Sequence, residues 1–108
     1  MKRSMKKEFN TDTYRFFRAS VLERDKYMCA KCGANGVLEP FVDLRVHLLN
    51  NKEIDEYHIS DMDNAVTLCS RCHDSMFQNS FHRLFGEENN TVEQYEKWLK
   101  MKYDKNKI

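Results

Sequence analysis

The sequence lacks any apolar run long enough to span a membrane, and its first residues lack the pattern of a secretory leader. These two absences exclude a membrane segment and lead us to expect an intracellular, cytoplasmic protein. The sequence also has no internal repeat and no low-complexity tract outside its lysine-rich end. At 108 residues we expect one domain with a thin core, and a core of that size favours an added metal staple.

Cysteine is scarce, and its four copies fall into two pairs with the same spacing. Cys29 and Cys32 bracket one CxxC turn, and Cys69 and Cys72 bracket the other. Two such turns supply four thiolates, which is the ligand set of a structural Zn²⁺ ion. Two disulfides are the alternative, but adjacent CxxC pairs without a secretory leader favour zinc. We therefore expect one structural zinc, whose removal unfolds the chain.

The formal net charge of +1 conceals an uneven distribution. Basic residues gather near both ends of the chain, and acidic residues concentrate between them. This distribution suits a phosphate backbone held from both sides of a metal centre, although charged ends are more often simply solvated. The basic residues in question are Lys2, Arg3, Lys6, Lys7, Lys97, Lys100, Lys102, Lys105 and Lys107.

The first half of the chain divides into an arm, a helix and an extended segment. We expect residues 1–10 to form a flexible basic arm, followed by a single domain over residues 11–108. Capping residues at 11–13 predict a helix that ends near Arg24, with a core stripe of Tyr14, Phe17, Val21 and Leu22. Residues 37–49 are expected to be extended, since positions 44–49 are rich in β-formers.

The second half is expected to contain one strand and two helices. Residues 63–69 return as a strand into the second cysteine pair, and a helix carrying His73 begins near Ser70. Asn90 and Glu93 have capping-box spacing and open a final helix. Its docking face is predicted to consist of Val92, Tyr95, Leu99 and Tyr103, with Trp98 at the border.

Several motifs, in this order, resemble those of the HNH endonucleases of phages and mobile elements. The stretch 44–49 is similar to the family's LxVHHL strand, 63–69 to DNLVTLC, and 69–73 to CxxCH. Further along, 81–86 resembles FHxxYG, and 89–95 resembles NNTxEQF. The matching stretches read LRVHLL, DNAVTLC, CSRCH, FHRLFG and NNTVEQY in this chain.

This resemblance implies an α+β fold: a small zinc-stapled ββα-metal (HNH) domain with flanking N- and C-terminal helices. It also implies one-metal hydrolysis of DNA phosphodiesters with Mg²⁺ or a similar divalent ion. Carried over residue by residue, His47 and His73 would be ligands of that ion. Asn64 would hold the loop and the base in position.

The chain departs from the family's pattern at the general base and at the second helix histidine. The base position holds Leu48, which cannot ionise. Residues 50–63 are expected to form a long polar loop, and His58 within it is the nearest candidate to replace the base. Phe77 stands where the second helix histidine is usual. His82 lies nine residues after His73, so it can join the metal site only if the helix breaks or restarts.

These departures leave two classes of function open. The first is an active HNH-type endonuclease with DNA as its partner. The second is a catalytically impaired HNH fold that binds DNA or protein, for example a phage-coded inhibitor of a host defence system. Loss of a positioned base typically lowers a rate by about 10² to 10⁴, which permits only slow cleavage.

Overall fold

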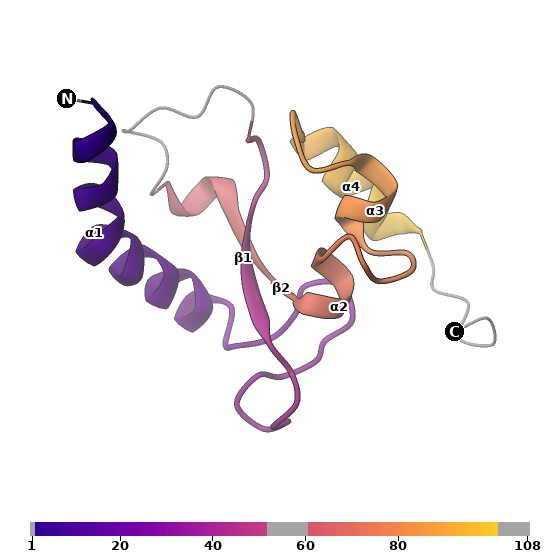
Figure 1. Ribbon diagram of the computed structural model, residues 1–108. Coiled ribbons are helices and arrows are strands. Elements are labelled where there is room, and N and C mark those ends of the chain that lie inside the picture. Colours follow the sequence, from indigo (N-terminus) through magenta and orange to yellow (C-terminus); the bar gives the residue numbers. More distant parts are fainter. Residues whose placement is uncertain (1, 52–60, 102–108) are drawn as a thin grey trace.

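A two-stranded antiparallel sheet lies at the centre of the fold, with α1 on one side and the other helices on the opposite side (Figure 1). The computed structural model describes residues 2–51 and 61–101, with side chains from residue 12 onward. Over these residues the chain is a small mixed α+β domain. Its elements are α1 (Lys2–Arg24), β1 (Leu44–Leu48), the 3₁₀-helix η1 (Met62–Asn64), β2 (Ala65–Cys69), α2 (Ser70–His73), α3 (Phe81–Phe85) and α4 (Val92–Lys100).

The hairpin confirms both expected strands, although each is shorter than predicted. In its register Leu44 pairs with Cys69, His47 with Val66, and Leu48 with Ala65. Residues 37–43 form a loop rather than the start of β1, and residues 62–64 form η1 ahead of β2. The register sets the second cysteine pair beside the start of β1 and places His47 in the middle of the sheet.

The first helix begins at Lys2, so residues 2–10 extend α1 rather than forming the separate arm that we expected. Its predicted apolar stripe is confirmed, because Phe17, Val21 and Leu22 are buried. Arg18 lies outside this stripe, and its guanidinium donates to the carbonyl of Leu44 across 3.0 Å. This hydrogen bond connects α1 to β1.

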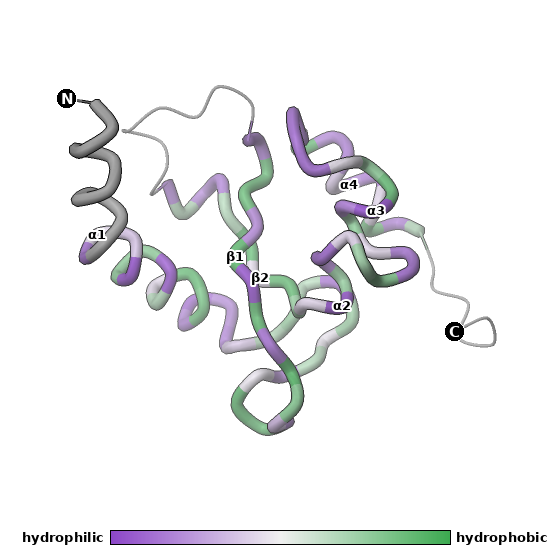
Figure 2. The backbone as a smooth tube through the Cα atoms, viewed as in Figure 1, coloured by the Kyte–Doolittle hydropathy of each residue, from purple (hydrophilic) through white to green (hydrophobic). Residues whose placement is uncertain are grey.

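The sheet separates two apolar clusters. Phe17 and Val21 of α1 pack with Ala65, and Leu48 lies against this cluster. On the other side, the larger cluster joins both cysteine pairs to the helices that follow them, and green segments meet there in Figure 2. This cluster comprises Leu22, Cys29, Leu44, Leu68, Cys69, Cys72, Phe81, Tyr95 and Trp98.

The last helix docks through Tyr95 and Trp98. Trp98 is fully buried rather than at the border of the docking face, whereas Leu99 is partly exposed. The helix cap also differs from the prediction by one residue. Thr91 is the N-cap, and the side chain of Gln94 completes the capping box in place of the expected Asn90 and Glu93. Tyr103 lies outside the described residues.

Asparagine side chains connect the end of β1 to the segment before α4. Asn51 Nδ2 donates to Asn90 Oδ1 at 2.8 Å, and the amide of Asn90 donates to Asn51 Oδ1 at 2.7 Å. Asn90 Nδ2 also donates to Gln94 Oε1 and to the carbonyl of Gly86. Asn90 is buried, so these bonds replace the water that its amide would otherwise require.

We predict that Asn90→Ala lowers the free energy of unfolding by about 2 kcal/mol, because it removes the hydrogen bonds of a buried side chain to Asn51, Gly86 and Gln94. Urea denaturation of the metal-loaded protein measures this change. Glu96→Ala, at an exposed position on the same helix, is the matched control and should be nearly neutral. Equal stability of the two variants would contradict the structural role of Asn90.

Candidate metal centres

The four cysteines form one cluster at the junction of the first loop and the hairpin. Their sulfur atoms all lie within 4.8 Å of one another, and Cys32 Sγ and Cys69 Sγ are 3.7 Å apart. The first CxxC turn is fixed to β2, because the amide of Ala30 donates to the carbonyl of Thr67 at 2.9 Å. Sulfurs that close together, from two CxxC turns, are compatible with a structural metal site.

The electrostatics of the cluster favour a cation. Hydrogen bonds from neighbouring thiols lower the pKa of Cys29, and the bond to Cys29 in turn raises the pKa of Cys69. The thiolate of Cys29 therefore opposes ionisation of the Cys69 thiol. A divalent ion removes that conflict, because all four sulfurs can then be deprotonated around one positive charge.

A second cluster consists of three histidines from three different elements. His47 comes from β1, His73 from the end of α2, and His82 from α3. One nitrogen of each ring lies within 4.8 Å of the others, and His47 and His82 are buried. The ring of His47 also packs on Phe81, with centroids 4.6 Å apart. The chain breaks between α2 and α3, and this break brings His82 into the cluster. A break of this kind is what we expected His82 to require.

Hydrogen bonds fix the tautomers of two of these rings. His73 Nδ1 lies 2.9 Å from Asp74 Oδ1, and His82 Nδ1 lies 2.8 Å from the carbonyl oxygen of Gly86. Since ionised carboxylates and carbonyls only accept, each Nδ1 must be the donor. Both Nε2 atoms then carry lone pairs, yet they face each other across 3.2 Å. Two facing lone pairs repel, and a cation between them removes the repulsion.

The third histidine supports the same conclusion. Nε2 of His47 is buried and has no hydrogen-bond partner among the described residues. Burial, together with the neighbouring His73 and His82, lowers the pKa of His47 to about 3, and burial also lowers the pKa of His73. These two rings are therefore neutral near pH 7, which is the form that binds metals. The donor set fits a divalent ion bound by three imidazoles.

Asp74 and Arg45 orient His73 without joining the histidine cluster themselves. Arg45 donates to both carboxylate oxygens of Asp74, at 3.3 and 3.0 Å, and Asp74 in turn orients His73. Burial alone would raise the pKa of Asp74, but the bonds from His73 and Arg45 keep it below its usual range. Metal-binding histidines usually donate to such a carboxylate. Asp74 directly follows His73 along the chain, which is only a weak signal for this role.

The remaining predicted site residues lie elsewhere. Asn64 does not join the histidines, because its side chain makes two hydrogen bonds of 2.9 Å with the backbone of Asn50. It thus joins residues 50 and 64, and its role in holding a catalytic base stays a prediction. His58 lies outside the described residues. Leu48 packs towards α1, on the side of the sheet opposite His47.

Comparison with protein-family models, with curated proteins and with solved structures found no match to this chain. Over the part of the chain that the structure describes, no helix has both the length and the apolar character needed to cross a membrane.

We predict that purified protein contains one tightly held zinc at the four cysteines and that Cys32→Ser weakens it. Because the metal contributes on the order of 10 kcal/mol in small zinc domains, removing it with a chelator should unfold the chain. Elemental analysis and circular dichroism measure the two effects. Chelated protein that keeps its full helical signal would contradict a structural metal.

For the histidine cluster, we predict that Asp74→Asn weakens Co²⁺ binding about 10- to 100-fold, because a neutral amide no longer polarises His73. The visible absorption of Co²⁺, titrated into protein whose cysteine site holds zinc, measures this affinity. Asp63→Asn, an exposed change in η1, is the control and should bind as the wild type does. Equal affinity of all three proteins would exclude Asp74 from the site.

Proposed function

We propose that this chain is an HNH-like nuclease domain that hydrolyses DNA phosphodiesters slowly at the His47–His73–His82 cluster, with zinc at the four cysteines as its structural staple. The observation that carries the proposal is the 3.2 Å approach of the Nε2 atoms of His73 and His82, beside the Nε2 of His47, which has no partner among the described residues. When bound there, a divalent ion would neutralise a scissile phosphate and stabilise the departing oxygen.

The arrangement around the cluster matches the motif order on which the resemblance rests. β1 supplies the first histidine, β2 leads into the second cysteine pair, and α2 carries His73 directly after Cys72. A hairpin followed by a helix therefore surrounds the histidines, and α3 adds His82. This agreement supports the ββα-metal fold as the finer description of the domain.

The donor set refines the choice of ion. Mg²⁺ prefers oxygen ligands, whereas imidazole suits zinc, nickel, cobalt and other transition metals. Three nitrogen ligands also leave coordination positions for a phosphate oxygen and water, as in catalytic zinc sites. We therefore propose a transition-metal ion rather than magnesium at the histidines.

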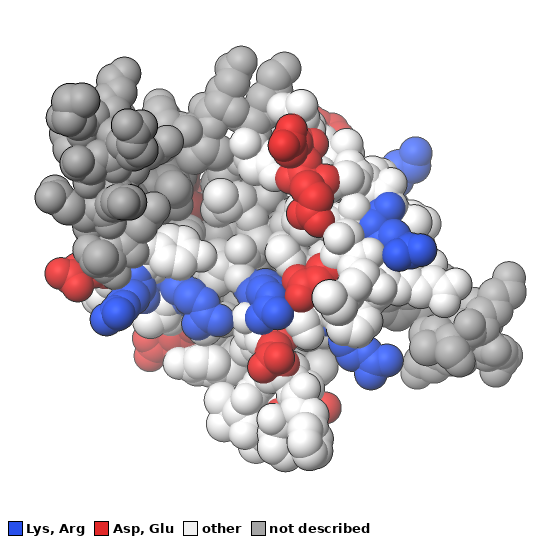
Figure 3. Space-filling model, in the orientation of Figure 1, with Lys and Arg blue, Asp and Glu red and all other residues white. Residues whose placement is uncertain are grey.

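DNA as the substrate is supported by charge. Figure 3 shows basic side chains spaced across the middle of one face, with acidic groups between them. Lys97 and Lys100 add positive charge in the last turn of α4. Contacts between such groups and phosphates give affinity without sequence specificity, and this affinity falls as salt rises.

The position of Leu48 favours a second candidate function. Its side chain lies against the cluster of Phe17, Val21 and Ala65, so an apolar contact occupies the position that the resemblance assigns to the general base. In this alternative the fold has lost hydrolysis and is kept to bind DNA or a protein.

We predict slow relaxation of supercoiled plasmid with Mn²⁺ or Co²⁺, and a rate that rises with pH. No imidazole at position 48 can take the proton of the attacking water. We therefore expect the proton to pass to solvent rather than to His58, and hydroxide becomes more available as pH rises. His73→Ala, which removes one ligand, should abolish the activity while the zinc content stays unchanged.

A bell-shaped pH profile would instead indicate a resident base. No relaxation at any pH, in protein whose histidine cluster binds Co²⁺, would select the second candidate. The second candidate covers two functions, DNA binding and protein binding. A low-salt gel shift of the intact protein distinguishes them, because only a DNA-binding protein slows the migration of a duplex.

A further inference from the structure

A loop between the first cysteine pair and β1 carries an unusual set of exposed apolar side chains. Leu38 is 78% exposed, Val37 is 65% exposed, and Phe41 is 95% exposed. This loop protrudes from the body of the domain (Figures 1 and 3) and is largely hydrophobic (Figure 2). An exposed apolar surface of this kind marks a site of interaction. We call Val37 and Leu38 the tip of the loop.

The tip is held in one conformation. The side-chain oxygen of Asn35 accepts from the amides of Val37 and Leu38, both at 2.8 Å. The amide of Glu39 donates to the carbonyl of Asn35 at 3.0 Å, which closes the turn. A surface that is already ordered loses little conformational entropy when it binds a partner.

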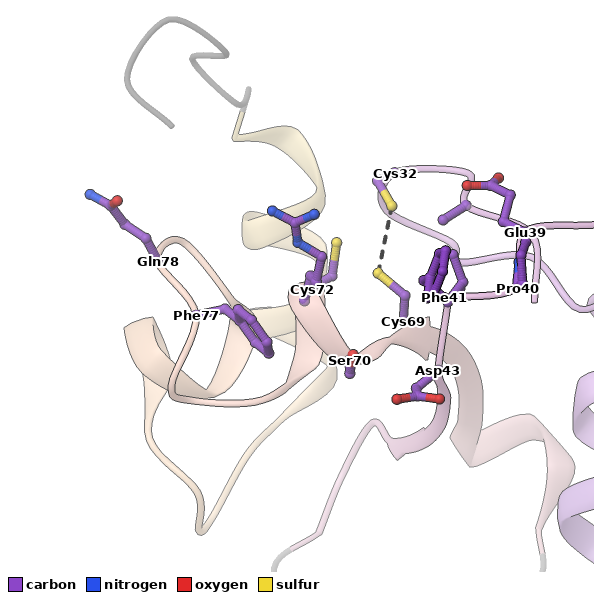
Figure 4. A pocket seen from close by; sticks show the side chains of 13 residues that line it. Cys32, Glu39, Pro40, Phe41, Asp43, Cys69, Ser70, Cys72, Phe77 and Gln78 are labelled. Atoms are coloured by element: carbon purple, nitrogen blue, oxygen red, sulfur yellow. Dashed lines mark hydrogen bonds between the residues drawn. The ribbon is translucent and has the colours of Figure 1, made fainter.

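A mostly apolar cavity of about 690 Å³ lies between residues 39–43 of the loop and the second CxxC turn, and it borders the cysteine cluster through Cys32, Cys69 and Cys72. Phe41 and Phe77 stand on its two sides, with Cys69 and Ser70 between them (Figure 4). Neither residue of the tip lines this cavity, so the tip cannot fill the cavity of its own chain. A protrusion and a cavity of matching chemistry therefore lie next to each other on one surface.

Charged side chains of both signs line the cavity: the carboxylates of Glu39 and Asp43 and the guanidinium of Arg71. Glu39 and Arg71 both line the cavity and are exposed. Arg71 has no hydrogen bond or ion pair within the described part of the chain, and Glu39 comes from the loop while Arg71 comes from α2. A two-fold interface through this surface would pair the Glu39 of each copy with the Arg71 of the other.

We infer that this surface is a homodimer interface, in which the tip of each copy enters the apolar cavity of the other. In a two-fold interface the same patch serves both partners, so it must contain both the protrusion and the recess and both signs of charge. The patch of this chain meets that requirement, with an apolar centre and a charged rim. This inference does not depend on the proposed function.

The test is sedimentation of the metal-loaded full chain over a range of concentrations. We expect a monomer–dimer equilibrium, with a dissociation constant that Leu38→Glu raises about 30-fold or more, because a buried apolar anchor becomes a charge. Phe16→Ser removes an equally exposed apolar side chain from α1 and is the matched control, which should leave the constant unchanged.

A charge exchange tests the geometry of the interface. Arg71→Glu and Glu39→Arg should each raise the dissociation constant about tenfold, and the double variant should restore most of the affinity. Zinc content is measured on each variant, because Arg71 lies within the second CxxC turn. A monomer at every concentration, or a dimer that Leu38→Glu leaves intact, overturns the inference; in the first case the patch serves a different protein or a duplex.

Discussion

The contact between the two CxxC turns is the constraint on which the rest of this structure depends. The hairpin is only two strands wide, and isolated hairpins are marginally stable in water. The cysteine cluster joins the first loop to the end of β2, and both then share one apolar cluster with α3 and α4. Lys31, within the first turn, extends this connection by donating to the carbonyl of Trp98 at 2.6 Å.

The two candidate metal centres are coupled through α2. This helix is one turn long, so Cys72 and His73 lie next to each other and serve different clusters. Any displacement of the cysteine cluster therefore moves His73 as well. His47 and His82 are held independently, by the hairpin register and by packing against Phe81. The histidine geometry thus requires that the whole domain be assembled.

His47 and Leu48 are neighbours in β1 but lie in different parts of the domain. Adjacent residues of a strand point to opposite faces, so His47 faces the helices after β2 while Leu48 faces α1. The histidine cluster and the contacts that Leu48 makes with α1 therefore lie on opposite sides of the hairpin.

The sequence alone determined those features that depend on residues close together along the chain. The CxxC pairs indicated the cysteine cluster, β-formers and caps indicated both strands and the last helix, and motif order indicated His47 and His73. Tertiary structure decided what depends on distant contacts. His82 joined the site because the chain between α2 and α3 turns back, and Trp98 became core because Phe81 packs against it. Local periodicity cannot specify such contacts, since they form only when the cysteine cluster and the hairpin bring remote segments together.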